Sequence, residues 1–323
     1  MAEHWLKQDT PLQNKKIWIA GHNGMVGSAL MRRLEGEGAQ LLGVSRQELD
    51  LRHQTDVRDW VFAHKPDMIV LAAAKVGGIM ANSENLATFF YDNMMISANV
   101  IHSAYEAGVG RLLFLGSSCI YPRECTQPIA EEALLGGALE PTNEAYALAK
   151  ISGLKMAQYY RTQYGCDFIS AMPCNLYGVG DSYDERHSHV IPALIMKVHK
   201  AKIEGAPSVH VWGSGRALRE FLYVDDLADI LVLLLQKYNS EHHINIGSGA
   251  EITIKELVRI ICEVIGYKGE IVFDTKFPDG TPRKVLDTSR LLGVGWEPKM
   301  WLKDGIKKCH EDFLGRYQDE YSG

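Results

Sequence analysis

Short, unbroken apolar runs separated by helical stretches constrain the fold of this chain more than any other feature of its sequence. Five such runs occur in the first half of the chain, at 16–20, 40–44, 68–74, 111–117 and 168–173. They lack polar alternation, as expected of strands that are covered on both faces. Two of the intervening stretches have helical spacing and end near glycine, 27–38 and 93–109. This order predicts an α/β fold with a doubly wound parallel sheet of the Rossmann type.

The strand–helix order weakens after residue 178 and predicts a second, smaller lobe. A helix over 191–202 and a strand near 208–212 are expected there, followed by a helix over 221–238 and a strand near 242–249 that return to the sheet. We therefore expect one domain from 14–178 with 222–247, and a C-terminal substrate lobe from 179–221 with 248–323. Ligands in such sheets bind at the carboxyl ends of the strands.

Composition argues against several classes of protein. The chain has 323 residues, 46% of them hydrophobic and 23% charged, and a net charge of −6, which disfavours nucleic acid or an anionic membrane as the main partner. No apolar run approaches the ~20 residues of a membrane helix, and the N-terminal stretch lacks the apolar core of a signal peptide. Six scattered cysteines without a CxxC pair favour reduced thiols, so we expect a cytoplasmic protein.

A glycine-rich turn follows the first expected strand. Gly21, Gly24 and Gly27 form a GxxGxxG pattern directly before an amphipathic stretch. Glycine permits a tight turn and close approach of the backbone, and a helix N-terminus supplies amides and a positive dipole for a pyrophosphate. The strand–turn–helix context favours dinucleotide binding.

The end of the second expected strand indicates which dinucleotide binds. A carboxylate there would bind the ribose 2′-hydroxyl of NAD, whereas arginine suits the 2′-phosphate of NADP. Arg46 stands 19 residues after Gly27, with Glu48 and Asp50 farther on. Arg46 favours NADP, although a solvated surface charge is the plainer alternative, and Asp50 could instead hydrogen-bond the adenine.

Tyr146 and Lys150 lie one helical turn apart, in a helix expected to begin at Thr142 or Asn143 and to end at Gly165. A lysine ammonium beside a phenol favours the phenolate, so we expect a lowered pKa for Tyr146. The phenol could then exchange a proton with a carbonyl while a nicotinamide exchanges the hydride.

The segment SSCIYP, residues 117–122, places two hydroxyls and a thiol at the carboxyl end of a strand. Ser117 would hydrogen-bond the substrate carbonyl oxygen and complete a Ser–Tyr–Lys triad. The plainer alternative is a turn in which serine caps and a small cysteine packs.

These features resemble the extended short-chain dehydrogenases/reductases, and within them the GDP-4-keto-6-deoxy-D-mannose 3,5-epimerase/4-reductases. The resemblance covers nearly the whole chain and lies in AGHNGMVGSA, LAAAKVGGI, NMMI, LFLGSSCIYP, EPTNEAYALAK, NLYG, SHVIPALI, VWGSG, REFLYVDDLA and PDGTPRK. SSCIYP and SHVIP are the specific motifs. Two positions depart from the pattern: Asn23 stands where some members carry an arginine for the 2′-phosphate, and Val179 stands where proline is usual.

The resemblance implies an NADPH-dependent enzyme that forms GDP-L-fucose by inversion at C3 and C5, followed by reduction at C4. Both inverted carbons are alpha to the ketone, so a base and an acid on opposite sides of the ring are needed. Cys119 is the expected base and His189 the expected acid, with a buried packing cysteine as the alternative. His187 and His189 form an HxH pair, but no cluster completes a metal site, so we expect no metal.

The resemblance also implies the ligand contacts, with NADP in the sheet domain and the GDP-sugar in the smaller lobe. Arg219 suits a pyrophosphate, and Trp212 could stack or merely fill the core. The expected substrate contacts are Lys197, Trp212, Arg219, Asp279 and Arg283. The expected cofactor contacts are Gly21, Asn23, Gly24, Met25, Val26, Gly27, Arg46, Asp50, Leu51, Ala73, Lys150, Pro173, Leu176 and His189.

Other interpretations stay open. A relative that acts on another GDP-4-keto sugar, such as a GDP-heptose, would carry the same motifs. A UDP-sugar 4-epimerase needs no cysteine and histidine pair, and a non-catalytic dinucleotide sensor would usually have lost part of the triad. The resemblance implies a homodimer in which two apolar helices of each copy form a four-helix bundle, 94–108 and 146–160.

Overall fold

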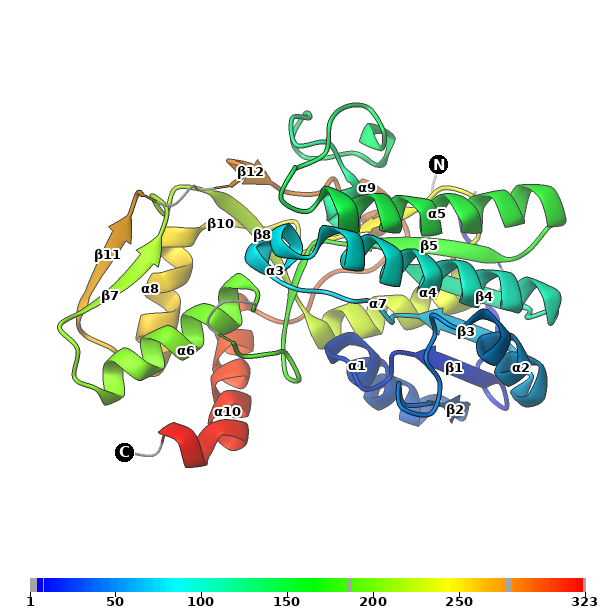
Figure 1. Cartoon of the computed structure of the whole chain (residues 1–323), viewed down its shortest axis with the longest axis horizontal. Coiled ribbons are helices and arrows are strands. Elements are labelled where there is room, and N and C mark those ends of the chain that lie inside the picture. The colour runs from blue at the N-terminus through cyan, green and yellow to red at the C-terminus, as the bar shows by residue number, and fades with distance from the viewer. Residues whose placement is uncertain (1–4, 8, 185–187, 277–279, 322–323) are drawn as a thin grey trace.

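A six-stranded parallel sheet, in the order β2-β1-β3-β4-β5-β9, forms the centre of the larger domain (Figure 1). The computed structural model describes residues 5–7, 9–184, 188–276 and 280–321. The strands are β1 (Lys16–Ala20), β2 (Gln40–Leu42), β3 (Met68–Leu71), β4 (Arg111–Leu115), β5 (Phe168–Pro173) and β9 (Ile244–Ile246). The predicted doubly wound α/β fold is confirmed.

Helices cover both faces of this sheet, which is why its strands are mostly apolar and lack polar alternation. Every residue of β3, β4 and β5 is buried, and successive side chains of a strand point to opposite faces. Helix α1 packs against α7, whereas α4 packs against both α2 and α5. The helices are α1 (Met25–Leu34), α2 (Gln54–His64), α3 (Ile79–Glu84), α4 (Leu86–Glu106), α5 (Glu144–Tyr164) and α7 (Val224–Lys237).

Two expected helices are placed more exactly by the structure. Helix α5 begins after Asn143 and ends at Gly165, whose φ of 71° is the left-handed conformation that favours glycine. The stretch 221–238, expected as one helix, is strand β8 (Leu218–Tyr223) before it becomes α7. Its first residues are extended because they pair with β6 (Asn175–Tyr177). Strand β9 then joins the sheet beside β5, as predicted.

The smaller lobe has its own apolar core and lies at the left of Figure 1. Strand β8 pairs with β10 (Glu251–Thr253) and β12 (Arg283–Lys284), and β7 (Ser208–Trp212) pairs with β11 (Glu270–Asp274). Three helices pack against these strands: α6 (Val190–Ile203), α8 (Ile254–Ile265) and α10 (Leu302–Tyr321). Within the described ranges, no helix is both long and apolar enough to cross a bilayer.

Residues 286–296 pack with the larger domain, although they fall in a range expected for the substrate lobe. Leu286, Leu291, Val294 and Trp296 belong to the core around the sheet. Helix α9 (Ser289–Gly293) accounts for this placement because it packs against β9.

Candidate active site

The glycine turn joins β1 to α1 and packs on the segment after β3. Gly21 has a φ of +96°, and a Cβ there would lie 2.7 Å from the backbone nitrogen of Ala73. A Cβ on Gly27 would lie 2.0 Å from the carbonyl oxygen of Gly21. Neither position admits a side chain, so glycine is required at Gly21 and Gly27 for steric reasons.

The first turn of α1 is suited to an anion. A Cβ on Gly24 would have only the Gly21 carbonyl within contact range, at 3.4 Å, so the turn is open there. No side chain caps the helix, and its first turn, with Met25 and Val26, carries no acidic residue. The free amides and the positive end of the helix dipole can therefore hold a pyrophosphate. Asn23 is exposed on the same turn.

The loop after β2 carries the charged residues that were candidates for the adenosine end of the cofactor. Asp50 is bound by Arg52, with 2.5 Å between Nη2 and Oδ2, and this hydrogen bonding lowers the pKa of Asp50 to about 2. Arg46 is exposed and makes no hydrogen bond or ion pair with any residue that the structure describes. Leu51 accepts a hydrogen bond from Asn99 Nδ2 at 2.9 Å.

Four of the five predicted catalytic residues meet at the carboxyl end of β4. Ser117 begins a short helical turn, and its Oγ accepts from the backbone N–H of Cys119 at 3.3 Å. Cys119 is only 7% exposed. Lys150 Nζ lies 5.8 Å from the ring centroid of Tyr146, on the same face of α5. Cys119 is near enough to Tyr146 and Lys150 to raise the pKa of each.

The expected lowering of the Tyr146 pKa is wrong for this structure. Burial raises the pKa of Tyr146 well above its ordinary value, and the neighbouring Cys119 raises it further. The Lys150 ammonium donates to the Leu115 carbonyl at 2.8 Å and lies over the rings of Phe114 and Tyr146. Burial also lowers the pKa of Lys150, to about 8. Tyr146 is therefore a neutral phenol, suited to donate a proton.

Lys284 is absent from the residues predicted from the sequence, yet it lies in the site. Burial raises the pKa of the Cys119 thiol, and the Lys284 ammonium is the strongest influence that lowers it, ahead of Ser117 and Lys150. Lys284 and Cys119 line one small pocket of about 50 Å³. The sequence signal that could have identified Lys284 is its position next to Arg283, because adjacent residues of a strand point to opposite faces.

His189 comes from a different element than the other four predicted catalytic residues. It is exposed and stands at the N-terminal boundary of α6. Across the described ranges, no hydrogen bond or ion pair joins it to Ser117, Cys119 or Tyr146. Its charge acts instead on Asp181, a buried carboxyl whose Oδ2 has no hydrogen-bond partner in the described part of the chain.

The predicted substrate contacts lie mainly in the smaller lobe. Lys197 Nζ lies 5.4 Å from the Trp212 ring, and Trp212 is 49% exposed, which contradicts the core-filling alternative. Arg219 is near enough to Lys284 to lower its pKa further, after burial. Arg283 binds Glu251, with 2.7 Å between Nε and Oε2.

The remaining predicted positions divide between the sheet edge and the undescribed residues. Pro173 ends β5, and Leu176 lies in β6 just beyond it. Asp279 and His187 lie outside the described residues. Among the residues that are described, no three His, Cys, Asp or Glu side chains converge to hold a metal ion.

Comparison with known proteins decides the family. A profile of the NAD dependent epimerase/dehydratase family matches residues 17–247. The chain belongs to this family. Its resemblance to one branch of that family is also confirmed, because the GDP-L-fucose synthase of Sinorhizobium fredii is 54% identical over 308 residues, which cover 95% of this chain and 98% of that protein.

Solved structures agree with this family. A GDP-L-fucose synthetase from Naegleria fowleri bound to NADP has a TM-score of 0.90 at 28% identity, with 98% of each chain covered. A GDP-6-OMe-4-keto-L-xylo-heptose reductase from Campylobacter jejuni has a TM-score of 0.88 at 36% identity, and the match covers 94% of this chain and 98% of that one.

Proposed function

We propose that this chain converts GDP-4-keto-6-deoxy-D-mannose to GDP-L-fucose with NADPH, by epimerisation at C3 and C5 followed by reduction at C4. The observation that carries the proposal is the cluster of Ser117, Cys119, Tyr146 and Lys150 at the end of β4. It occurs in a chain more than half identical to a GDP-L-fucose synthase.

The glycine turn and the loop after β2 would hold the cofactor. The first-turn amides of α1 face the open position at Gly24 and would bind the pyrophosphate. Arg46, which forms no ion pair with any described residue, would bind the 2′-phosphate. When bound, NADPH supplies the hydride for the reduction.

The proton chemistry is assigned to side chains of the cluster. Cys119 would remove the protons at C3 and C5 as a thiolate, which Lys284 and Lys150 stabilise. Ser117 and Tyr146 would hydrogen-bond the ketone oxygen, and Tyr146, a neutral phenol, would protonate it during reduction. We assign the acid on the opposite side of the ring to His189.

The smaller lobe would hold the GDP moiety. Trp212 offers an exposed indole face for the base, with Lys197 beside it. Arg219 and Lys284 bring two cations together beside the pocket that Cys119 lines, where a diphosphate would offset their mutual repulsion. The two separate apolar cores support this division between a cofactor domain and a substrate lobe.

The proposal also includes a homodimeric assembly and a cytoplasmic location. Helices α4 and α5 pack side by side (Figure 1). They carry exposed aromatic and aliphatic side chains, Tyr91, Leu148 and Tyr159 among them. We propose that a second copy covers these side chains in a homodimeric four-helix bundle. Six cysteines without disulfides fit a reducing cytoplasm.

The test is NADPH oxidation by the purified chain across a panel of GDP-4-keto sugars, with the product stereochemistry read by NMR. GDP-L-fucose from the 6-deoxy-mannose substrate supports the proposal. The similarity to the heptose reductase makes a GDP-4-keto-heptose the necessary comparison. A kcat/KM at least tenfold higher on the heptose would assign the chain to that second activity instead.

A further inference from the structure

Helix α4 ties two loops at the carboxyl edge of the sheet through polar side chains that it buries. Asp92, Asn93 and Asn99 are each less than 5% exposed, although they lie on a surface helix. Buried polar groups of this kind are retained where they have partners. Their partners here lie in the loop after β2 and in the segment after β3.

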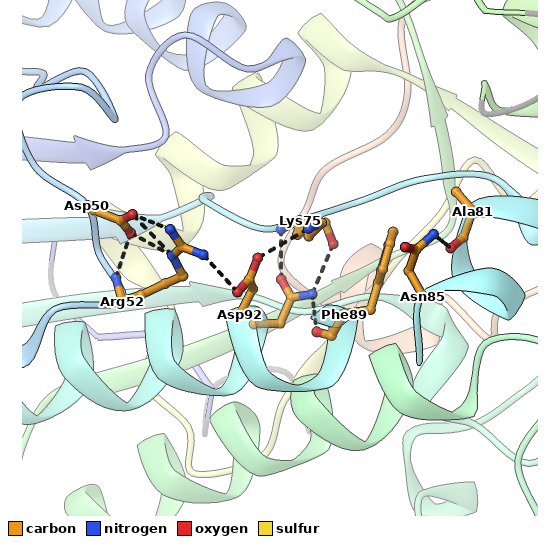
Figure 2. A network of polar contacts seen from close by, with 8 residues as sticks. Asp50, Arg52, Lys75, Ala81, Asn85, Phe89 and Asp92 are labelled. Carbon is orange, nitrogen blue, oxygen red and sulfur yellow. Dashed lines mark hydrogen bonds and ion pairs between the residues drawn. The ribbon is translucent and has the colours of Figure 1, made fainter. Parts of the chain in front are cut away.

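Asp92 holds one cation from each of these loops. Its Oδ1 lies 3.2 Å from Arg52 Nη1, and its Oδ2 lies 3.3 Å from Lys75 Nζ. Figure 2 shows the carboxylate between the two cations, with Arg52 reaching on to Asp50. Asp92 is only 3% exposed, whereas the side chains of Arg52 and Lys75 are 32% and 37% exposed, so the two cations meet a buried carboxylate from the solvent side.

The neighbouring amide reinforces the second loop. Asn93 Oδ1 accepts from the Lys75 backbone N–H at 2.8 Å, and its Nδ2 donates to the Lys75 carbonyl at 2.9 Å. Asp92 and Asn93 therefore fix both the ammonium and the peptide of Lys75. Two residues earlier, the backbone of Ala73 is what excludes a side chain at Gly21.

The contacts form a continuous chain along the edge where a dinucleotide would lie. Asp50 and Leu51 belong to the adenosine end of the expected site, and Ala73 packs on the pyrophosphate turn. Asp92 is the carboxylate that joins the two sides, through Arg52 and Lys75. A dinucleotide that spans this edge needs both loops at a fixed separation, and preorganised loops bind with a smaller entropic cost.

We propose that Asp92 is a positioning residue for the dinucleotide: it sets the distance between the loop after β2 and the loop after β3, and it does so without touching the cofactor. The proposal rests on the proposed function only in requiring that NADPH binds. A carboxylate that merely stabilised the fold would change the free energy of unfolding and leave the affinity for NADPH as it is.

The test is direct titration of the full chain with NADPH, followed by nucleotide fluorescence, in the absence of any sugar substrate. Asp92→Asn keeps the shape of the side chain but removes its charge and turns an amide donor toward one of the two cations. We expect the Kd for NADPH in this titration to rise about tenfold. In a separate assay with the GDP-sugar substrate, kcat at saturating NADPH should fall less than threefold.

Asp167→Asn is the matched control. Asp167 also binds several cations, Arg111 and Lys7 among them, but it precedes β5 and so lies at the amino edge of the sheet, opposite the expected site. It should lower the melting temperature and leave the Kd for NADPH within twofold. An unchanged Kd in Asp92→Asn, or an equal rise in the control, would overturn the proposal.

Two further variants keep the test decisive if Asp92→Asn does not fold. Arg52→Gln and Lys75→Met each remove one of the two ion pairs, and each should raise the Kd for NADPH severalfold. Failure of both to do so refutes the role of Asp92, as does a wild-type chain that does not bind NADPH. Tight NADPH binding without turnover of the GDP-sugar would refute the proposed function alone.

Discussion

Replacement of Cys119 by serine separates the two reactions assigned to this site. Cys119 is nearly buried and stands in a short helical turn, so the slightly smaller serine should be accepted without a change of fold. Because burial raises the pKa of the Cys119 thiol, only a small fraction of the thiol is ionised at neutral pH. The contribution of the base should then be near the low end of the usual range, roughly 100-fold.

The assay is the reaction in deuterated water. The wild-type product should carry deuterium at C3 and C5, with a rate that rises about tenfold per pH unit below the thiol pKa. Cys119→Ser should lose roughly 100-fold or more in that exchange and lose the pH dependence. Its ketone, still held by Ser117 and Tyr146, should be reduced without inversion to a GDP-sugar of different stereochemistry.

Cys125→Ser is the control, because Cys125 is partly exposed and its sulfur bonds the nearby Pro122 carbonyl and Gln127 amide. It should retain wild-type exchange at both carbons. If Cys119→Ser still incorporates deuterium at C3 and C5 at the wild-type rate, another group removes those protons, and the thiol is a packing residue.

Three further outcomes are expected. Arg46→Asp should raise the KM for NADPH at least tenfold, about 1.4 kcal/mol, and reduce the difference between the KM values for NADPH and NADH. An unchanged preference for NADPH over NADH would contradict the contact between Arg46 and the 2′-phosphate. Between about pH 8 and the ordinary lysine pKa of 10.5, Lys150 is protonated in the unfolded chain but not in the folded one. The free energy of unfolding, measured by urea titration, should therefore rise with pH by up to roughly 3 kcal/mol more in the wild type than in Lys150→Met. If the two proteins show the same pH dependence of stability, the lowered pKa is refuted. Leu148→Glu with Tyr159→Glu should convert a dimer to a monomer in light scattering, whereas a monomeric wild type would refute the four-helix bundle.

The sheet and its helices could be predicted because strands that are buried on both faces have short apolar sequences without polar alternation. Strand β3 is apolar throughout and β4 is apolar after Arg111, and Gly21 and Gly27 mark places where a Cβ would collide with backbone. Helix α5 could be bounded for the same local reason, because Gly165 adopts a conformation that other residues resist.

The pKa values and ion pairs of the site could not be predicted in this way, because they depend on side chains that are far apart in the sequence and come together only in the folded chain. The spacing of Tyr146 and Lys150 places them on one helix face, but the ammonium turns to the Leu115 carbonyl of another element. Lys284 reaches Cys119 from a strand 165 residues later in the chain. Asp92 lies in a helix whose apolar content suggests only packing, and its role depends on Arg52 and Lys75.

The burial of Cys119 also protects the side chain from chemical damage. Alkylating agents and peroxides attack the thiolate, and they need access to the sulfur. With 7% of its surface exposed and its proton retained at rest, Cys119 offers little of either. Cys125 and Cys166 are more open to solvent and would be oxidised first. The same burial that keeps the Cys119 thiol protonated therefore also shields its sulfur from oxidants.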